Sequence, residues 1–413
     1  MQSTPKSLRL HIGIFGRRNV GKSSLLNALT RQEISIVSEV AGTTTDPVEK
    51  AMEMLPVGPV LFIDTAGIDD EGALGEMRIG KTVRVFDRTD LAIVVGASGE
   101  WGEFENRLVG EFSIRKVPTI VVFNKSDLGT PDPSLKLHLE GKGIRTVLTC
   151  APSRAGLLDL REAIIRSAPE DFINQPTIVG DLVPAGEMAV LVIPIDLEAP
   201  KGRLIVPQVQ TIRDLLDNDS YCMVVKEREL AEALARLTRP PKIVITDSQA
   251  FLRVAGDAPE SILLTSFSIL FARLKGDLTE MVRGACAIDK LRPGSRVLVC
   301  EACTHHPIGD DIGRVKIPRW LMQYVGGELI FDQISGHDFP SDVSKYNLVV
   351  HCGACVHNRR EVLTRIAVCR HQGVPITNYG LAIAFSLGIF ERALRPFPAA
   401  LDAYKAAIAQ RRK

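Results

Sequence analysis

The stretch that decides the fold of the first part of the chain is Gly16-Arg17-Arg18-Asn19-Val20-Gly21-Lys22-Ser23-Ser24. A strand-like apolar run, residues 8–15, precedes it, and a helical pattern, residues 25–30, follows it. A glycine-containing loop in that position is the signature of a phosphate-binding loop, in which backbone N–H groups surround the phosphates. Lys22 is expected to reach the β- and γ-phosphates, and Ser23 to ligate Mg²⁺. The sequence therefore predicts a nucleotide site that contains Gly16, Asn19, Gly21, Lys22, Ser23 and Ser24.

Two further motifs follow predicted strands in the order that this fold requires. In Asp64-Thr65-Ala66-Gly67, Asp64 is expected to hold Mg²⁺ and the N–H of Gly67 to meet the γ-phosphate. In Asn124-Lys125-Ser126-Asp127, the Asp127 carboxylate can accept from both N1–H and the exocyclic amine of guanine, which adenine cannot match. Cys150-Ala151 stands where such domains usually carry Ser-Ala under the base. The predicted nucleotides are GTP and GDP.

Strand and helix patterns alternate along the rest of the chain, which predicts parallel sheets covered by helices. Residues 48–55, 91–95 and 119–123 are among the expected strands. We expect three α/β domains, with the P-loop domain over residues 1–167, a second over 188–275 and a third over 276–413. Residues 168–187 contain several prolines and are expected to form a linker.

Composition excludes several classes of protein. The chain has 413 residues, a formal net charge of +1 and 45% hydrophobic residues. A near-neutral chain is not an obvious nucleic-acid or membrane-surface binder. No apolar run approaches the roughly 18 residues of a spanning helix, and no signal core stands at the beginning. We expect a cytoplasmic protein without nucleic-acid or membrane partners.

Cysteine and histidine gather in two clusters of the third domain. The first is Cys300-Glu301-Ala302-Cys303-Thr304-His305-His306, and the second is His351-Cys352-Gly353-Ala354-Cys355. Both follow predicted strands, and α/β folds build their sites at the carboxyl ends of strands. Thiolates and imidazoles that converge from two loops can bind zinc or an iron–sulfur cluster.

Two ligand sets compete for these residues. Four cysteines could form a zinc site, although the two pairs lie much farther apart than the roughly 15–20 residues of compact zinc ribbons. Cys300 also ends an apolar strand, where a buried free thiol is expected. Alternatively, three thiolates hold a 4Fe–4S cluster and leave one iron open: Cys303, Cys352 and Cys355. Candidates for the remaining position are Glu301, His305, His351, water and an exogenous ligand.

The first domain resembles the TrmE and Era groups of GTPases, on the Asn19-to-Ser23 motif and on Gly42-Thr43-Thr44-Thr45-Asp46. The resemblance implies that Thr44, with Thr43 and Thr45 as alternatives, completes the Mg²⁺ shell and that Asn19 helps to hold K⁺. The TrmE-like glutamate that positions water precedes Arg-Ile-Gly, but here Met77 takes its place. We expect slow, K⁺-stimulated hydrolysis that depends on Lys22, Thr44, Asp64 and Gly67.

The pattern Cys-x-His followed by His-Cys-x2-Cys, joined to a GTPase domain and a cysteine-poor middle domain, resembles the HydF family of FeFe-hydrogenase maturation GTPases. The resemblance implies a scaffold that binds a 4Fe–4S cluster through Cys303, Cys352 and Cys355. Such a scaffold receives a transient di-iron subcluster made by two radical-SAM maturases and delivers it to apo-FeFe-hydrogenase. The family further implies a homodimer through the middle domain. The alternative function is a structural-zinc GTPase in tRNA modification or ribosome assembly.

The other cysteines and several histidines belong to no motif. We expect four cysteines to be small core residues, namely Cys150, Cys222, Cys286 and Cys369. We expect His337, His357 and His371 at the surface or at helix ends.

Overall fold

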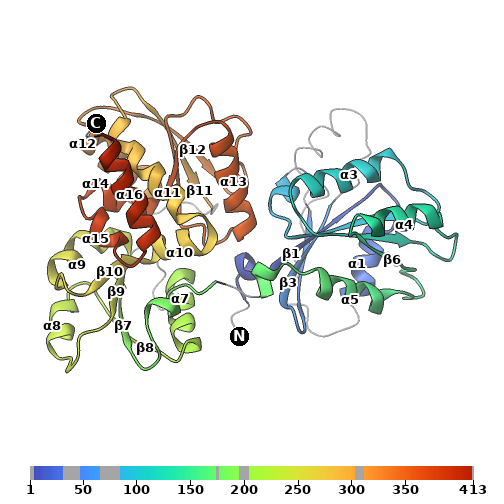
Figure 1. Cartoon of the computed structure of the whole chain (residues 1–413), viewed down its shortest axis with the longest axis horizontal. Coiled ribbons are helices and arrows are strands. Elements are labelled where there is room, and N and C mark those ends of the chain that lie inside the picture. The colour runs from blue at the N-terminus through green and yellow to red at the C-terminus, as the bar shows by residue number, and fades with distance from the viewer. Residues whose placement is uncertain are drawn as a thin grey trace. The chain divides into compact units, whose positions relative to one another are not determined.

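The computed structural model describes residues 4–30, 47–65, 84–173, 176–194, 204–302 and 311–411. The chain divides into two compact units, residues 1–175 and 176–413, which we call the first and second units (Figure 1). Each unit is described by itself. In the described ranges, no helix is both long enough and apolar enough to span a bilayer.

The first unit is built on a six-stranded sheet with the order β2-β3-β1-β4-β5-β6 in its described part. Its strands are β1 (Leu10–Phe15), β2 (Val48–Met54), β3 (Gly58–Asp64), β4 (Leu91–Ala97), β5 (Thr119–Asn124) and β6 (Arg145–Leu148). Its helices are η1 (Lys6–Leu8), α1 (Lys22–Thr30), α3 (Glu103–Ile114), α4 (Pro133–Gly141), α5 (Leu157–Ser167) and α6 (Glu170–Ile173). β2 is antiparallel to β3, and the other neighbouring pairs are parallel.

Helices cover both faces of this sheet. Alternate residues of β3 enter different cores, since Phe62 packs in one apolar cluster and Leu61 and Ile63 in another. The first cluster takes side chains from α1 and α5, and the second from α3 and α4. Figure 1 shows these helix pairs on opposite sides of the strands. This double coverage explains why β1 and β4 are buried along their whole length.

The second unit contains two parallel four-stranded sheets, with the orders β10-β9-β7-β8 and β12-β11-β13-β14 in the described residues. The strands of the first sheet are β7 (Met188–Val192), β8 (Tyr221–Val225), β9 (Ile243–Thr246) and β10 (Leu263–Ser266). Those of the second sheet are β11 (Arg296–Glu301), β12 (Ile330–Ser335), β13 (Leu348–His351) and β14 (Ile376–Asn378).

The helices of the second unit fall between and after these strands. The segments before β11 are η2 (Gly180–Leu182), α7 (Val206–Asp217), α8 (Leu230–Ala235), η3 (Ser248–Ala250), α9 (Phe251–Asp257), α10 (Phe267–Lys275), α11 (Leu278–Cys286) and η4 (Ala287–Lys290). After β11 come η5 (Ile312–Lys316), α12 (Ile317–Val325), α13 (Arg359–His371), α14 (Tyr379–Ser386), α15 (Phe390–Leu394) and α16 (Pro398–Arg411). The prediction of three α/β regions is confirmed.

The two sheets of the second unit share one apolar core, and α10 joins them. α10 contacts α7 beside the first sheet and α13 and α14 beside the second (Figure 1). The side chain of Ser266 caps α10, and that of Asn378 caps α14, by accepting from backbone N–H groups. Asn378 Nδ2 also donates to the Ser268 carbonyl at 2.8 Å. The carboxyl ends of β10 and β14 are therefore held close together.

The expected linker, residues 168–187, has its own structure. It contains α6 and η2, and Val179 and Val183 are fully buried in the core of the second unit. The Asp214 carboxylate accepts from the N–H groups of Ile178, Val179 and Gly180 at 2.8–3.0 Å. Residues 176–187 thus pack as part of the second unit.

Candidate functional site

The phosphate loop joins the end of β1 to the start of α1. Lys22 is buried, and its Nζ donates to the carbonyls of Gly16 at 2.8 Å and Arg17 at 2.7 Å. These bonds hold the ammonium group against the loop, where it can reach phosphate oxygens. Gly21 has a φ of 91°, and a Cβ there would lie 2.4 Å from Asn124 Nδ2. Only glycine fits this position, because both the backbone angle and the space exclude a side chain.

The two expected Mg²⁺ ligands of the described residues meet at this loop. Ser23 Oγ donates to Asp64 Oδ2 at 2.6 Å, which joins the start of α1 to the end of β3. Burial raises the pKa of Asp64, and the Ser23 hydrogen bond and Lys22 oppose that shift. Within the described part of the chain, the buried Asp64 Oδ1 finds no hydrogen-bond partner. A hydroxyl beside a carboxylate with a spare oxygen fits a hard divalent cation.

The guanine motif is tied to the phosphate loop by Asn124. Its Nδ2 donates to the Val20 carbonyl at 2.8 Å, and its Oδ1 accepts from Thr149 Oγ1 at 3.1 Å. Both polar ends of this buried side chain are thus bonded to protein, so Asn124 fixes the loop. Lys125, which follows, has a left-handed φ of 59°.

Cys150 supports the residue expected to bind guanine. Its Sγ donates to Asp127 Oδ1 at 3.2 Å, and Asp127 itself is exposed. A serine hydroxyl could make the same contact, so cysteine is a conservative replacement here. Ala151 beside it is buried. Asn19, in the phosphate loop, is exposed and has a left-handed φ of 62°.

Several predicted residues lie outside the described ranges. In the first unit these are Thr43, Thr44, Thr45, Gly67 and Met77. In the second unit they are Cys303, His305 and His306. The structure therefore brings together the phosphate loop, Asp64 and the guanine motif, and leaves the roles assigned to these other residues as predictions.

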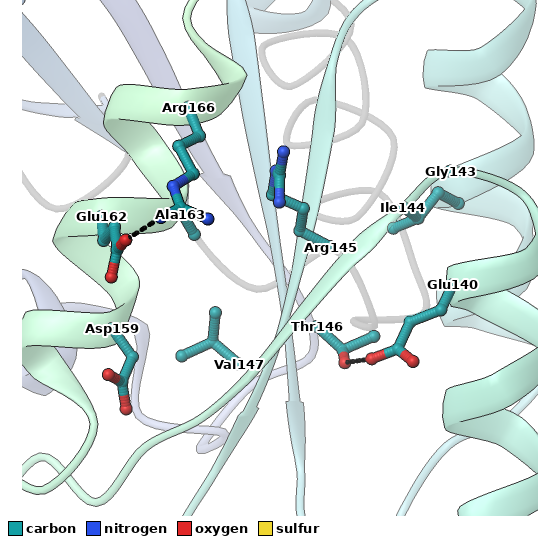
Figure 2. A pocket seen from close by; sticks show the side chains of 10 residues that line it. All are labelled: Glu140, Gly143, Ile144, Arg145, Thr146, Val147, Asp159, Glu162, Ala163 and Arg166. Atoms are coloured by element: carbon teal, nitrogen blue, oxygen red, sulfur yellow. Dashed lines mark hydrogen bonds and ion pairs between the residues drawn. The ribbon is translucent and has the colours of Figure 1, made fainter.

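Another hollow of the first unit, about 490 Å³, lies between α4, β6 and α5 (Figure 2). It is lined by no motif residue. Three of its charged groups have neighbours as partners, since Thr146 Oγ1 donates to Glu140 at 2.8 Å and Arg166 pairs with Glu162. We assign it no ligand.

The candidate metal centre of the second unit lies at the carboxyl ends of β11 and β13. The backbone N–H of Cys352 donates to the Cys300 carbonyl at 2.8 Å. This bond fixes the position of Cys352, the first cysteine of the loop that follows β13. Cys352 Sγ accepts from the N–H of Ala302 at 3.1 Å and of Ala354 at 3.4 Å. Burial and the neighbouring Cys355 raise the pKa of Cys352 to about 11. The two N–H groups suit a thiolate, and a bound metal would supply the charge that deprotonates it.

Cys300, by contrast, is fully buried in the core, and burial raises its thiol pKa far above the ordinary value. Its carbonyl, not its side chain, is bonded to the loop of Cys352. This environment is that of an inert core thiol and is unfavourable to the four-cysteine zinc set. Cys150, Cys286 and Cys369 are also buried, while Cys222 is half-buried.

Lys275 is a residue that the sequence analysis missed. It ends α10, is buried, and its Nζ donates to the carbonyls of Ala354 and His357 at 2.7 Å each. Burial lowers the pKa of Lys275 to about 8, although Cys355 and Cys352 oppose that shift. A cation that clamps the cysteine loop favours negative charge there. Its position at a helix end was the only signal in the sequence, and it is a weak one.

His351 makes its bonds within the protein. Its Nε2 accepts from Arg365 Nη1 at 2.9 Å, because a guanidinium only donates, so the proton lies on Nδ1 and is given to the Cys352 carbonyl at 2.9 Å. Burial and the charge of Arg365 lower the pKa of His351 to about 3. Both nitrogens are thus occupied, and the role of His351 as a ligand stays a prediction.

The three histidines were expected at the surface or at helix ends. His357 stands just before the start of α13 and has only 1% of its surface exposed, whereas His371 is exposed at the end of α13. The side chain of His337 is 41% exposed.

A pocket of about 290 Å³ opens beside the cysteine loop. Cys352 and Cys355, in the loop after β13, line it on one side, and Phe267 and Phe271 of α10 line it on another. The Tyr379 hydroxyl is buried at this pocket, and no hydrogen-bond partner for it lies in the described ranges. The pocket therefore combines two thiols, an apolar wall and an unpaired hydroxyl.

Comparisons with known proteins match the three parts in order. Residues 11–125 match the 50S ribosome-binding GTPase model, residues 178–276 the hydrogen maturase F dimerization domain, and residues 279–396 the hydrogen maturase F tetramerization domain. The two domain types indicate homo-oligomers, and tetramerization was not predicted from the sequence.

The GTPase part is similar to curated proteins of other kinds. It is 41% identical over 136 residues to GTPase Der of Mycoplasmopsis pulmonis, and the matched stretch covers 32% of this chain and 31% of that protein. It is 40% identical over 159 residues to the tRNA modification GTPase MnmE of Aquifex aeolicus, which covers 38% of this chain and 34% of that protein. The chain thus spans about a third of the length of these relatives.

Among solved structures, the G domain of the FeoB iron transporter of T. maritima is similar to the first part of this chain. The match covers 38% of this chain and 98% of the FeoB chain, at 23% identity and a TM-score of 0.31.

The first unit is a P-loop GTPase domain related to Der and MnmE. Because this domain is followed by two consecutive hydrogen maturase F domains, the chain belongs to the hydrogen maturase F (HydF) family.

Proposed function

We propose that this protein is a GTP-hydrolysing scaffold for the maturation of FeFe-hydrogenase. It holds a 4Fe–4S cluster, receives the di-iron precursor from two radical-SAM maturases and delivers it to the apo-enzyme. The observation that carries the proposal is the Cys352 thiol, which receives two backbone N–H groups at the wall of a pocket shared by both sheets.

Cys303, Cys352 and Cys355 would hold the cluster, and the candidates for its last position remain Glu301, His305, His351, water and an exogenous ligand. Three thiolates leave one iron of such a cluster with an open coordination position for the cargo. Lys275 clamps the loop through two carbonyls and places positive charge near both described thiols. Glu301 and Tyr379 line the same pocket and face whatever occupies it.

The GTPase domain would act as a switch that modulates partner release. Lys22 binds the phosphates, Ser23 and Asp64 bind Mg²⁺, and Asp127 selects guanine. Thr44 and Gly67 would complete the catalytic set, and Asn19 would hold K⁺. We keep residues 1–167, 188–275 and 276–413 as the proposed domains, and residues 176–187 pack with the second of them.

The middle domain is proposed to form the dimer. In the described part of its sheet, β8 pairs with β7 alone and is an edge strand. It exposes Tyr221 and Val224, which have 53% and 46% of their surface accessible. An apolar edge strand favours pairing with a second copy.

The proposal is tested first by metal analysis of protein purified without oxygen. Roughly four iron and four sulfide per chain, with a brown charge-transfer band, is the expected result. One zinc and no sulfide after anaerobic reconstitution would contradict it and favour the structural-zinc GTPase.

A variant separates a functional cluster from a structural metal. Cys352→Ser is expected to stay folded and hydrolyse GTP while losing the cluster and the activation of apo-hydrogenase. Cys222→Ser, at a half-buried thiol away from the loop, is the matched control. Gross unfolding of Cys352→Ser alone would instead indicate a structural metal.

The role of potassium is tested by GTP turnover in KCl and NaCl at equal ionic strength. Faster turnover in KCl is expected, and Asn19→Ala should abolish the difference. Equal rates in the two salts would remove K⁺ from the proposal.

A further inference from the structure

His337, His357 and Glu361 form a cluster that the maturation function does not use. One possible ligand atom from each side chain lies within 4.8 Å of the other two. His337 follows the end of β12, His357 precedes α13, and Glu361 lies in the first turn of α13. His357 Nε2 and Glu361 Oε1 nevertheless lie close together, 3.5 Å apart, at the start of α13.

The buried histidine of this cluster is unsatisfied. The His357 side chain is 0% exposed, and neither ring nitrogen has a hydrogen-bond partner among the residues that the structure describes. Its Nε2 lies 3.5 Å from Glu361 Oε1, too far for a good hydrogen bond. An unpaired buried imidazole costs about 1–3 kcal/mol, so a bound partner would remove a real penalty.

The other two side chains complete a set of metal ligands. His337 Nδ1 lies 3.0 Å from both Glu361 oxygens. The imidazole rings of His337 and His357 have their centroids 5.1 Å apart. The rings are stacked at an interplanar angle of 24°, so the partly exposed His337 ring would have to turn for both imidazoles to meet one ion. The exposed side of His337 gives the ion and a water molecule access.

Nearby positive charges restrain the site and limit its affinity. Arg365 Nη2 donates to Glu361 Oε1 at 2.7 Å and to the Gly336 carbonyl at 2.8 Å. Arg365 thus takes one carboxylate oxygen and leaves Oε2, which also faces His337, for an ion. The Lys275 ammonium bonds to backbone carbonyls and not to these side chains.

We propose that His337, His357 and Glu361 bind one divalent transition-metal ion, Zn²⁺ or Fe²⁺, at a site separate from the cysteine loop. Two imidazoles and one carboxylate with an open position are a ligand set known for both ions. The ion would tie the end of β12 to the start of α13. Since Arg365 bonds to both Glu361 and His351, it would also stiffen the support of the cysteine loop.

The test is a titration of the full chain, stripped of metal, with Co²⁺. Besides any Co²⁺ that the thiols of the cysteine loop take up, which shows the intense near-ultraviolet band of thiolate-to-cobalt charge transfer, we expect one further equivalent that gives visible d–d bands without that band. The titration is repeated in Cys355→Ser, where cluster binding is impaired. The thiolate-free signal should persist there, so its loss and the failure of the cluster proposal are separate results.

Two variants test the ligands. His337→Ala removes a partly exposed side chain and leaves the core intact, while His357→Leu replaces the buried imidazole with an apolar group of similar size. Each should weaken the thiolate-free Co²⁺ binding at least roughly tenfold, about 1.4 kcal/mol. His371→Ala, at the exposed end of the same helix, should leave it unchanged.

Unchanged binding in both ligand variants, or no thiolate-free binding in the parent protein, would overturn the proposal. Competition with Zn²⁺ and with Fe²⁺ under anaerobic conditions then identifies the ion. Displacement of Co²⁺ by neither would also overturn it.

Discussion

The nucleotide site and the cysteine site differ in how far apart along the sequence their bonded residues lie. In the phosphate loop, Lys22 bonds to carbonyls five and six positions away. At the cysteine site, Lys275 bonds to the carbonyls of Ala354 and His357, 79 and 82 positions away. Phosphate binding relies mainly on the backbone of one loop, so a local motif suffices. A thiol site relies on packing that brings separate loops together, and its supporting residues carry no motif.

The largest effect is expected from Lys22→Ala. Loss of the charged contacts to phosphate should weaken GTP binding by at least about 100-fold, roughly 2.7 kcal/mol. The measurement is titration with a fluorescent GTP analogue, and Lys136→Ala, at an exposed lysine of α4, is the control. The iron content should not change. A parallel loss of iron would show that the two sites depend on each other.

The next largest effect is expected from Lys275→Met. The thioether keeps the volume of the side chain but leaves the buried carbonyls of Ala354 and His357 unpaired, which costs about 1–3 kcal/mol each. Urea unfolding should show lower stability of the second unit, and iron retention should fall while GTP binding persists. Lys345→Met, at a lysine whose side chain is 54% exposed, serves as the control. Normal iron content in Lys275→Met would contradict a role of Lys275 in holding the cysteine loop for metal binding.

Asn124→Ala tests the tertiary contact within the site that otherwise depends on local sequence. It removes the bonds to the Val20 carbonyl and Thr149, so the phosphate loop loses a brace. Two buried hydrogen bonds at about 0.5–1.5 kcal/mol each predict a roughly tenfold loss of GTP affinity. Calorimetric titration measures it, with exposed Asn106→Ala as the comparison. Affinity equal to the parent would mean that the loop needs no support from β5.

The smallest effect is expected from Cys150→Ser. A hydroxyl is a better donor than a thiol to the Asp127 carboxylate, so guanine nucleotides should bind up to about five times more tightly. Cys150→Ala should bind them slightly more weakly than the parent. If serine weakened binding more than alanine, the Cys150–Asp127 contact would have no role in recognition.

Prediction from sequence succeeded where periodicity and motifs were strong. The strand expected at 91–95 is β4, Leu91–Ala97, and the one expected at 48–55 is β2, Val48–Met54. It was weaker where burial depends on distant partners. Val179 and Val183 stand in a proline-containing stretch, yet both are buried in the core of the second unit, and Asp214 binds the backbone N–H groups of residues 178–180. His357, which was expected at the surface or at a helix end, stands just before α13, and only the tertiary structure shows that it is buried.

The sequence by itself determined the order of the α/β regions, the phosphate loop, the guanine motif and the two cysteine clusters, because these features are encoded by neighbouring residues. The tertiary structure decided the rest. It buried Cys300, occupied both nitrogens of His351 and brought Lys275 to the cysteine loop. The physical reason is that burial and hydrogen-bond partners depend on contacts between segments far apart in the chain, which no local pattern specifies.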